Sequence, residues 1–211
     1  MVAAVAVAQE RSPVAPGAQL EKVSGEFKFT EGPTTDADGD VYFTDQPNDR
    51  IMKWSVDGKI TTFLQPCGRS NGLCFDPQGQ LWACADEKNE LWRIDVATKK
   101  IEAVLKEREG KLFNGPNDVW CRPQGGLYFT DPCYKRPYWK HRDPQRQLPE
   151  IVYFLSAAGK LSVADADFKQ PNGLVGTPDG KTLYVADIGG KKTYAYDIQP
   201  DGALTNRRLF Y

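Results

Sequence analysis

Hydrophobic residues gather in short runs along the chain, and clusters of Gly, Pro, Asp and Asn separate these runs. Aromatic and β-branched residues dominate the most apolar runs, a composition that favours strands. These runs are VYFTD, LWACAD, LYFTD and LYVAD, and two further β-prone runs follow each of them. The pattern predicts an all-β fold. The segment VATKKIEAVLKERE, from Val96, also fits an amphipathic helix, but it occupies the place of a fourth strand, and we predict a strand there.

The apolar runs belong to a phrase that occurs four times: a polar residue, a short strand, a Pro/Gly/Asp turn and a second strand. When the copies are aligned on their turns, the polar residues that coincide are Glu31, Asn71, Asn117 and Asn172. A four-stranded unit repeated every 40 to 55 residues is typical of a β-propeller blade. The first strand of each blade lines the central channel, so we expect these four side chains to converge near one axis.

Two segments stand outside the repeats. The insertion YKRPYWKHRDPQRQLPE lengthens the third unit, and connections of this length are often binding loops. Its Tyr134, Tyr138 and Trp139 either pack over a ligand or anchor the loop. The segment LEKVSGEFKFT precedes the first unit without a partner in it, and in closed propellers a terminal strand commonly completes the last blade.

Charge and hydropathy exclude several classes of function. The 27 basic and 28 acidic residues nearly cancel, which gives little support to binding of nucleic acid through phosphate neutralisation. We interpret the basic and aromatic run KRPYWKHR as a solvated loop rather than a nucleotide-stacking site. No apolar run approaches the ~20 residues of a transmembrane helix. We therefore expect neither a nucleic-acid partner nor a membrane.

The N-terminus and the cysteines bear on the cellular compartment. MVAAVAVAQ resembles the apolar core and cleavage pattern of an export signal. We therefore expect a signal remnant and linker in residues 1–18, a propeller domain in residues 19–211, and a periplasmic or secreted protein. The alternative is an apolar N-terminus of no consequence on a cytoplasmic protein. The five cysteines lack zinc-site spacing, and we interpret them as packed thiols, with one disulfide as the alternative.

The repeated polar positions indicate a metal site rather than a triad. The chain has one histidine, His141, which excludes a multi-histidine zinc site and disfavours a Ser-His-Asp triad. Carboxylate and amide oxygens favour a hard cation, calcium before magnesium or manganese. For a single asparagine, turn chemistry is the commoner explanation. The recurring aspartates at the ends of the second strands are expected to accept backbone N–H bonds; they are Asp45, Asp86, Asp131 and Asp187.

Three phrases together resemble the SMP-30/gluconolactonase family, also called regucalcin-like, over residues from about 20 to 211. They are Glu31-Gly32-Pro33, Phe113–Asp118 with Leu127–Pro132, and Pro171–Leu174. The resemblance implies a six-bladed propeller of which this chain holds four blades, with a divalent cation, commonly calcium, in the channel. It places metal ligands at Glu31, Asn117 and Asn172. The fourth ligand, an aspartate that also serves as general base, is expected beyond residue 211.

The resemblance also implies hydrolysis of a small lactone, such as a gluconolactone. An arginine that some members carry before the asparagine-aspartate pair is Gly115 here, which leaves the substrate open. The candidates for substrate contacts are Asn71, Arg69, Asp131 and Tyr134. The alternatives are a non-catalytic propeller that binds a partner, and a metal-free strictosidine-synthase-like enzyme. An open ring also exposes sheet edges, so we expect a tendency to oligomerise.

Overall fold

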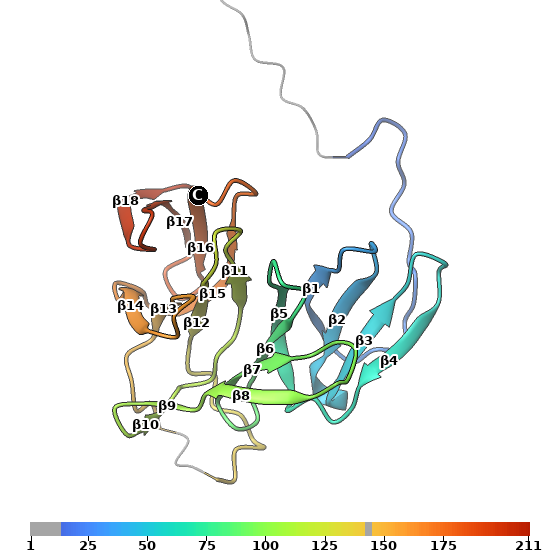
Figure 1. Ribbon diagram of the computed structural model, residues 1–211, viewed down its shortest axis with the longest axis horizontal. Coiled ribbons are helices and arrows are strands. Elements are labelled where there is room, and N and C mark those ends of the chain that lie inside the picture. The colour runs from blue at the N-terminus through green and yellow to red at the C-terminus, as the bar shows by residue number, and fades with distance from the viewer. Residues whose placement is uncertain (1–13, 142–144) are drawn as a thin grey trace, which may run out of the picture.

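The computed structural model describes residues 14–141 and 145–211, and the expected export signal lies almost entirely outside them. Four antiparallel sheets of four strands each follow one another along the chain. The first strands of the four sheets face the middle of a fan, and the fourth strands lie outside, as Figure 1 shows. This arrangement is a β-propeller with four blades. No helix in the described part is long and apolar enough to cross a membrane.

The strand bounds agree with the predicted repeat. Blade 1 holds β1 (Thr30–Thr35), β2 (Val41–Asp45), β3 (Arg50–Trp54) and β4 (Ile60–Leu64). Blade 2 holds β5 (Ser70–Phe75), β6 (Leu81–Ala85), β7 (Glu90–Ile94) and β8 (Ile101–Leu105). Blade 3 holds β11 (Val119–Cys121), β12 (Leu127–Asp131), β13 (Ile151–Leu155) and β14 (Leu161–Asp165). Blade 4 holds β15 (Pro171–Gly176), β16 (Thr182–Asp187), β17 (Lys192–Ile198) and β18 (Leu204–Leu209).

The ambiguous segment after Val96 is a strand, as predicted. Its residues Ile101–Leu105 form β8, which pairs antiparallel with β7. Pairing with the rest of the blade decides this outcome, because tertiary contacts override a weak helical periodicity. The sequence did not indicate the small ribbon of β9 (Glu107–Arg108) and β10 (Lys111–Leu112), nor the single 3-10 turn η1 (Gln46–Asn48).

Apolar side chains fill the spaces between neighbouring blades, and the largest cluster lies between blades 2 and 3. Phe113 is completely buried there and makes edge-to-face contacts with Phe129 and Tyr153, at ring-centroid distances of 5.6 and 5.4 Å. Burying a side chain of this size stabilises the fold by about 2–3 kcal/mol. None of the five cysteines forms a disulfide. The backbone N–H of Cys121 donates to Sγ of Cys74 across the same junction, at 3.2 Å.

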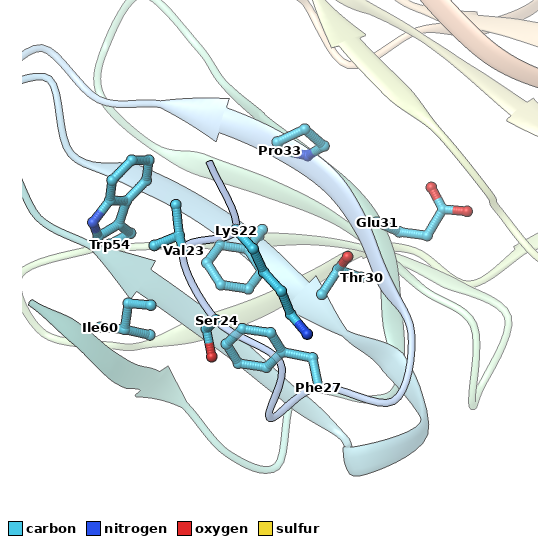
Figure 2. A pocket seen from close by; sticks show the side chains of 10 residues that line it. Lys22, Val23, Ser24, Phe27, Thr30, Glu31, Pro33, Trp54 and Ile60 are labelled. Carbon is cyan, nitrogen blue, oxygen red and sulfur yellow. The ribbon is translucent and has the colours of Figure 1, made fainter. Parts of the chain in front are cut away.

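The segment before β1 packs on blade 1 instead of forming a separate strand. The backbone N–H groups of Lys28 and Phe29 donate to the Asp45 carboxylate, at 3.1 and 3.4 Å. The expectation that this segment lacks a partner in the first unit is therefore wrong. The segment also forms one side of a pocket of about 410 Å³. Glu31 belongs to the wall of this pocket, but its carboxylate points away from it (Figure 2).

Irregularities in the first strands occur at the repeated polar positions. The register shifts between Glu31 and Thr34 in β1, between Ser70 and Leu73 in β5, and between Pro171 and Leu174 in β15. A bulge of this kind bends the strand and redirects a side chain, which is why bulges are common beside binding sites. The local backbone thus turns the polar residue of the repeat away from the regular pleat.

Glycine permits the closest approach of two blades, and this leads to a prediction. A Cβ at Gly72 would lie 2.6 Å from Cα of Asp118 and 2.8 Å from the carbonyl oxygen of Asn117, whereas a Cβ at the equivalent Gly173 would meet nothing closer than 3.8 Å. We expect Gly72→Ala to lower the free energy of unfolding by about 1–3 kcal/mol, because the backbones must separate. Urea denaturation measures this difference. Gly173→Ala is the matched control, and equal effects of the two substitutions would contradict the explanation.

Candidate functional site

The first strands of all four blades surround one central cavity of about 1020 Å³. Three of the four repeated polar residues line it, namely Glu31, Asn117 and Asn172. Asn71 is nearly completely buried and does not line the cavity, whose blade 2 wall consists of Gly72, Leu73 and Cys74. The structure therefore brings together the three residues for which metal ligation was predicted.

Hydrogen bonds between blades fix the backbone around the central cavity. The N–H of Gly72 donates to the carbonyl oxygen of Asn117 at 2.7 Å, which joins blades 2 and 3. Oγ1 of Thr130 donates to the carbonyl oxygen of Asn172 at 2.7 Å and accepts the N–H of Asp118 at 3.1 Å. One threonine thus connects two cavity-lining segments from neighbouring blades.

A second threonine makes the same connection between blades 1 and 2. Oγ1 of Thr44 lies 3.1 Å from the carbonyl oxygen of Glu31 and 3.0 Å from that of Asn71. Thr44 and Thr130 are completely buried and precede the repeated aspartates of β2 and β12. The equivalent residues in blades 2 and 4 are Ala85 and Ala186. A Thr before the repeated aspartate therefore allows a side-chain hydrogen bond to the first strand of the next blade, and an Ala at this position does not.

Two carboxylates share the central cavity. Burial raises the pKa of Glu31, although the N–H of Gly32 and the charge of Arg136 oppose this shift. Burial also raises the pKa of Asp118 to about 6, against hydrogen bonds from the N–H groups of Leu174 and Val119, and the negative charge of Glu31 adds to the rise. Neither carboxylate forms an ion pair with a Lys or Arg within residues 14–141 and 145–211. A cation in the cavity would relieve this repulsion.

The two cavity asparagines offer amide oxygens. The side chain of Asn117 makes no hydrogen bond with any described residue, although it is nearly completely buried. Nδ2 of Asn172 donates to the hydroxyl of Tyr134 at 2.6 Å, which directs the amide nitrogen towards the insertion and leaves Oδ1 for a ligand. One carboxylate and two amide oxygens are ligands suited to calcium. The residues present therefore fit the expected cation.

No group of three His, Cys, Asp or Glu side chains capable of holding a metal occurs in the described ranges. This observation concerns only those four residue types. It does not test the Glu31, Asn117 and Asn172 set, because two of these ligands are amides. The assignment of the three residues as metal ligands stays a prediction.

Three of the four recurring aspartates accept backbone N–H bonds, as predicted. Asp45 accepts from Lys28 and Phe29, Asp131 from Asn114 and Gly115, and Asp187 from Lys169 and Gln170, at distances between 2.8 and 3.4 Å. Asp131 is fully buried, and each of its carboxylate oxygens accepts one of these bonds. The structure thus places it in support of the backbone before Asn117 rather than in contact with the central cavity.

Asp86 departs from the pattern of the other three aspartates. Asp49 accepts the N–H groups of Cys67 and Arg69 at 3.0 and 2.7 Å. In blade 2, Asp49 therefore supports the segment before the first strand, which the repeated aspartate supports in the other blades. The Asp86 carboxylate accepts instead from Nε of Arg136 at 2.7 Å and from the hydroxyl of Tyr138. The Asp86 carboxylate therefore fastens the insertion of blade 3 to blade 2.

The run KRPYWKHR is a solvated loop only in part: Lys135, Lys140 and His141 are exposed, whereas its aromatic residues pack against blade 2. The Trp139 side chain is 5% exposed, and its Nε1 donates to the carbonyl oxygen of Asp86 at 2.8 Å. Arg69 stacks on the ring of Tyr138 at 4.7 Å and thus supports the insertion. Tyr138 and Trp139 act as anchors, whereas Tyr134 reaches the candidate ligand Asn172. The sequence pattern did not single out Asp118 and Arg136, because the other repeats carry no equivalent residue at either position.

The sequence pattern of the SMP-30/Gluconolactonase/LRE-like region family matches residues 29–211. This chain belongs to that family. Among its relatives, a gluconolactonase from Zymomonas mobilis subsp. mobilis is 29% identical over 206 residues, which cover 90% of this chain and 58% of that protein.

Two solved structures share the fold of this chain. A gluconolactonase from Xanthomonas campestris matches with a TM-score of 0.81 and 29% identity over 89% of this chain and 64% of that chain. A calcium-binding regucalcin from Agrobacterium tumefaciens matches with a TM-score of 0.69 and 21% identity over 87% of this chain and 59% of that chain. At this level of identity, the similarity to the regucalcin establishes a shared fold and not a shared function. The chain thus spans 58% and 64% of the lengths of the two gluconolactonases.

The hydrogen bonds of Thr130 between blades 3 and 4 lead to a prediction about stability. Thr130→Val keeps the shape of the side chain but removes the hydrogen bonds to Asn172 and Asp118. Because both partners are backbone groups at a buried junction, we expect a loss of about 1–3 kcal/mol in urea unfolding. Thr61→Val on exposed β4 is the control, expected to change stability by about 0.5 kcal/mol or less. A neutral Thr130→Val would show that the link contributes nothing.

Proposed function

We propose that the protein hydrolyses the ester bond of a small lactone of a sugar acid, with a divalent cation, calcium before others, held in the central cavity. The convergence of Glu31, Asn117 and Asn172 on one cavity carries this proposal. Its support from relatives is the Zymomonas gluconolactonase, whose match covers nearly all of this chain. The regucalcin described as calcium-binding shares the fold and agrees with the choice of cation.

Three residues of this chain would hold the cation: the Glu31 carboxylate and the side-chain oxygens of Asn117 and Asn172. A cation bound there would polarise the lactone carbonyl and stabilise negative charge on its oxygen. The hydroxyl of Tyr134 keeps the Asn172 amide in the orientation that offers Oδ1. The Thr130 hydroxyl donates a hydrogen bond to the backbone carbonyl of Asn172. Two hydrogen bonds, one to the side chain and one to the backbone, therefore fix the position of this ligand.

The reaction adds one water molecule to the lactone. Water attacks the carbonyl carbon, the ring C–O bond breaks, and the ring oxygen receives a proton, which yields an open hydroxy acid that ionises at neutral pH. A base must accept the proton of the attacking water. We assign the role of this base to no residue of the chain.

The function is tested by following acid release from glucono-δ-lactone above its spontaneous rate, with calcium and with a chelator. Calcium-dependent turnover supports the proposal. Calcium binding without turnover favours the alternative of a non-catalytic propeller with a structural ion. Turnover that is indifferent to the chelator would exclude the proposed metal dependence and retain only the hydrolase.

The Glu31 carboxylate is the only charged side chain among the three proposed ligands, and this gives a prediction. Glu31→Gln should weaken calcium binding by at least about tenfold, because the charge of the ligand set tunes affinity for calcium. Isothermal calorimetry on the purified chain measures the dissociation constant. Asp38→Asn makes the same change of charge at an exposed turn of blade 1 and should leave the constant unchanged. Equal affinity in wild type and Glu31→Gln would remove Glu31 from the ligand set.

A further inference from the structure

Arg136 occupies a position that the candidate ligands do not explain. It comes from the insertion of blade 3, yet its Nε donates to the Asp86 carboxylate of blade 2 at 2.7 Å. Its guanidinium also stacks on the ring of Tyr134, with the central carbon 5.0 Å from the ring centroid. The Tyr134 hydroxyl accepts the amide of Asn172. Arg136 is therefore one side chain away from a candidate ligand of the central cavity.

The two contacts of Arg136 fix its orientation but leave donors unused. Nε is engaged by Asp86 and one face of the guanidinium covers Tyr134. Its terminal nitrogens donate to no residue in the part of the chain that the structure describes, and the side chain is 23% exposed. A planar guanidinium held at Nε and on one face presents its remaining N–H groups in a fixed direction. This is the arrangement of a binding group rather than of a solvated surface charge.

The local backbone shows that the Asp86 support is built into the fold. A Cβ at Gly115 would lie 2.6 Å from Oδ1 of Asp86 and 3.0 Å from Cζ2 of Trp139. Gly115 has φ of +148°, so a larger residue there would be strained as well as crowded. The segment that leads to Asn117 therefore accommodates the carboxylate that holds Arg136. The segment before β5 is supported by Asp49, which accepts the N–H groups of Cys67 and Arg69.

A chain of contacts places Arg136 close to the proposed site. Its guanidinium lies over the ring of Tyr134, the Tyr134 hydroxyl accepts a hydrogen bond from Nδ2 of Asn172, and Asn172 lines the central cavity. Glu31 and Asn172 line the central cavity, and Tyr134 and Arg136 of the blade 3 insertion adjoin it through Asn172. We refer to these four residues as the polar entrance.

We propose that Arg136, positioned by Asp86 and Tyr134, is the substrate-binding residue that makes the site selective for hydroxylated lactones. This inference rests on the proposed lactone hydrolysis and deepens it. The terminal nitrogens of Arg136 donate to hydroxyl oxygens on the lactone ring, while the ester faces Glu31, Asn117 and Asn172. A lactone without hydroxyl groups forms no hydrogen bonds with these N–H groups. Its binding displaces water from the Arg136 guanidinium without replacing the hydrogen bonds that the water made, which weakens binding.

The experiment compares two lactones with the same ring size. Glucono-δ-lactone carries hydroxyl groups, and δ-valerolactone carries none. We expect Arg136→Met to lower kcat/KM for glucono-δ-lactone by about 10- to 100-fold, chiefly through KM, because the hydrogen bonds form in the bound substrate and persist in the transition state. The value for δ-valerolactone should change by less than about twofold. Arg136→Lys, which keeps the charge but not the planar fork, should recover part of the loss.

A control and a second readout separate this role from a structural one. Arg146→Met removes an equal charge from the same insertion, where Arg146 is exposed and pairs with Glu150 at 3.1 Å, and it should leave both lactones unaffected. If Arg136 only fastened the insertion, Arg136→Met would lower both activities by the same factor. That result would overturn the proposal.

Binding of gluconate, measured by calorimetry, does not depend on turnover. Wild type should bind gluconate at least about tenfold more tightly than Arg136→Met. If wild type hydrolyses neither lactone but shows this difference in binding, the proposed hydrolysis fails and Arg136 remains a binding residue for polyhydroxylated acids. If wild type hydrolyses lactones and Arg136→Met discriminates between them as wild type does, the inference fails and the proposed function stands. Equal gluconate binding, or none, in both proteins would also overturn the inference.

Discussion

The close approach of the first strands is the constraint on which the rest of the structure depends. Where β5 meets the segment before β11, the N–H of Gly72 reaches the carbonyl oxygen of Asn117 at 2.7 Å, and no Cβ fits between the two backbones. Such proximity brings polar residues from separate blades to one cavity, but it also removes water from them. The raised pKa values of Glu31 and Asp118 are the electrostatic consequence.

The repeat supplies a scaffold, and its exceptions supply the candidate site. Three of the recurring aspartates accept backbone N–H groups and so hold the segments that lead into the first strands. In blade 2, Asp49 takes over this support, and Asp86 binds Arg136 of the insertion instead. Asp86, which is the same residue type as the repeated aspartates of the other blades, thus positions Arg136 of the polar entrance.

The sequence pattern was sufficient to predict the four blades and to place three candidate ligands in one cavity. The β-prone runs define which residues can pair, and the period of the repeat places Glu31, Asn117 and Asn172 at equivalent points of successive blades. The same logic failed for the insertion, because its sequence has no equivalent in the other units. Its basic residues suggested a solvated loop, whereas Trp139 is buried and Arg136 is paired across a blade boundary.

The sequence by itself determined the class of fold, the number of repeated units and the convergence of polar side chains, because these follow from periodicity and from the geometry of one unit. Only the tertiary structure decided which partners the recurring residues take. Asp86 and Asp131 occupy the same place in the repeat, yet one binds a guanidinium and the other binds backbone N–H groups. The choice depends on what a neighbouring blade brings within hydrogen-bond distance, and residues 50 positions apart carry no local pattern that records it.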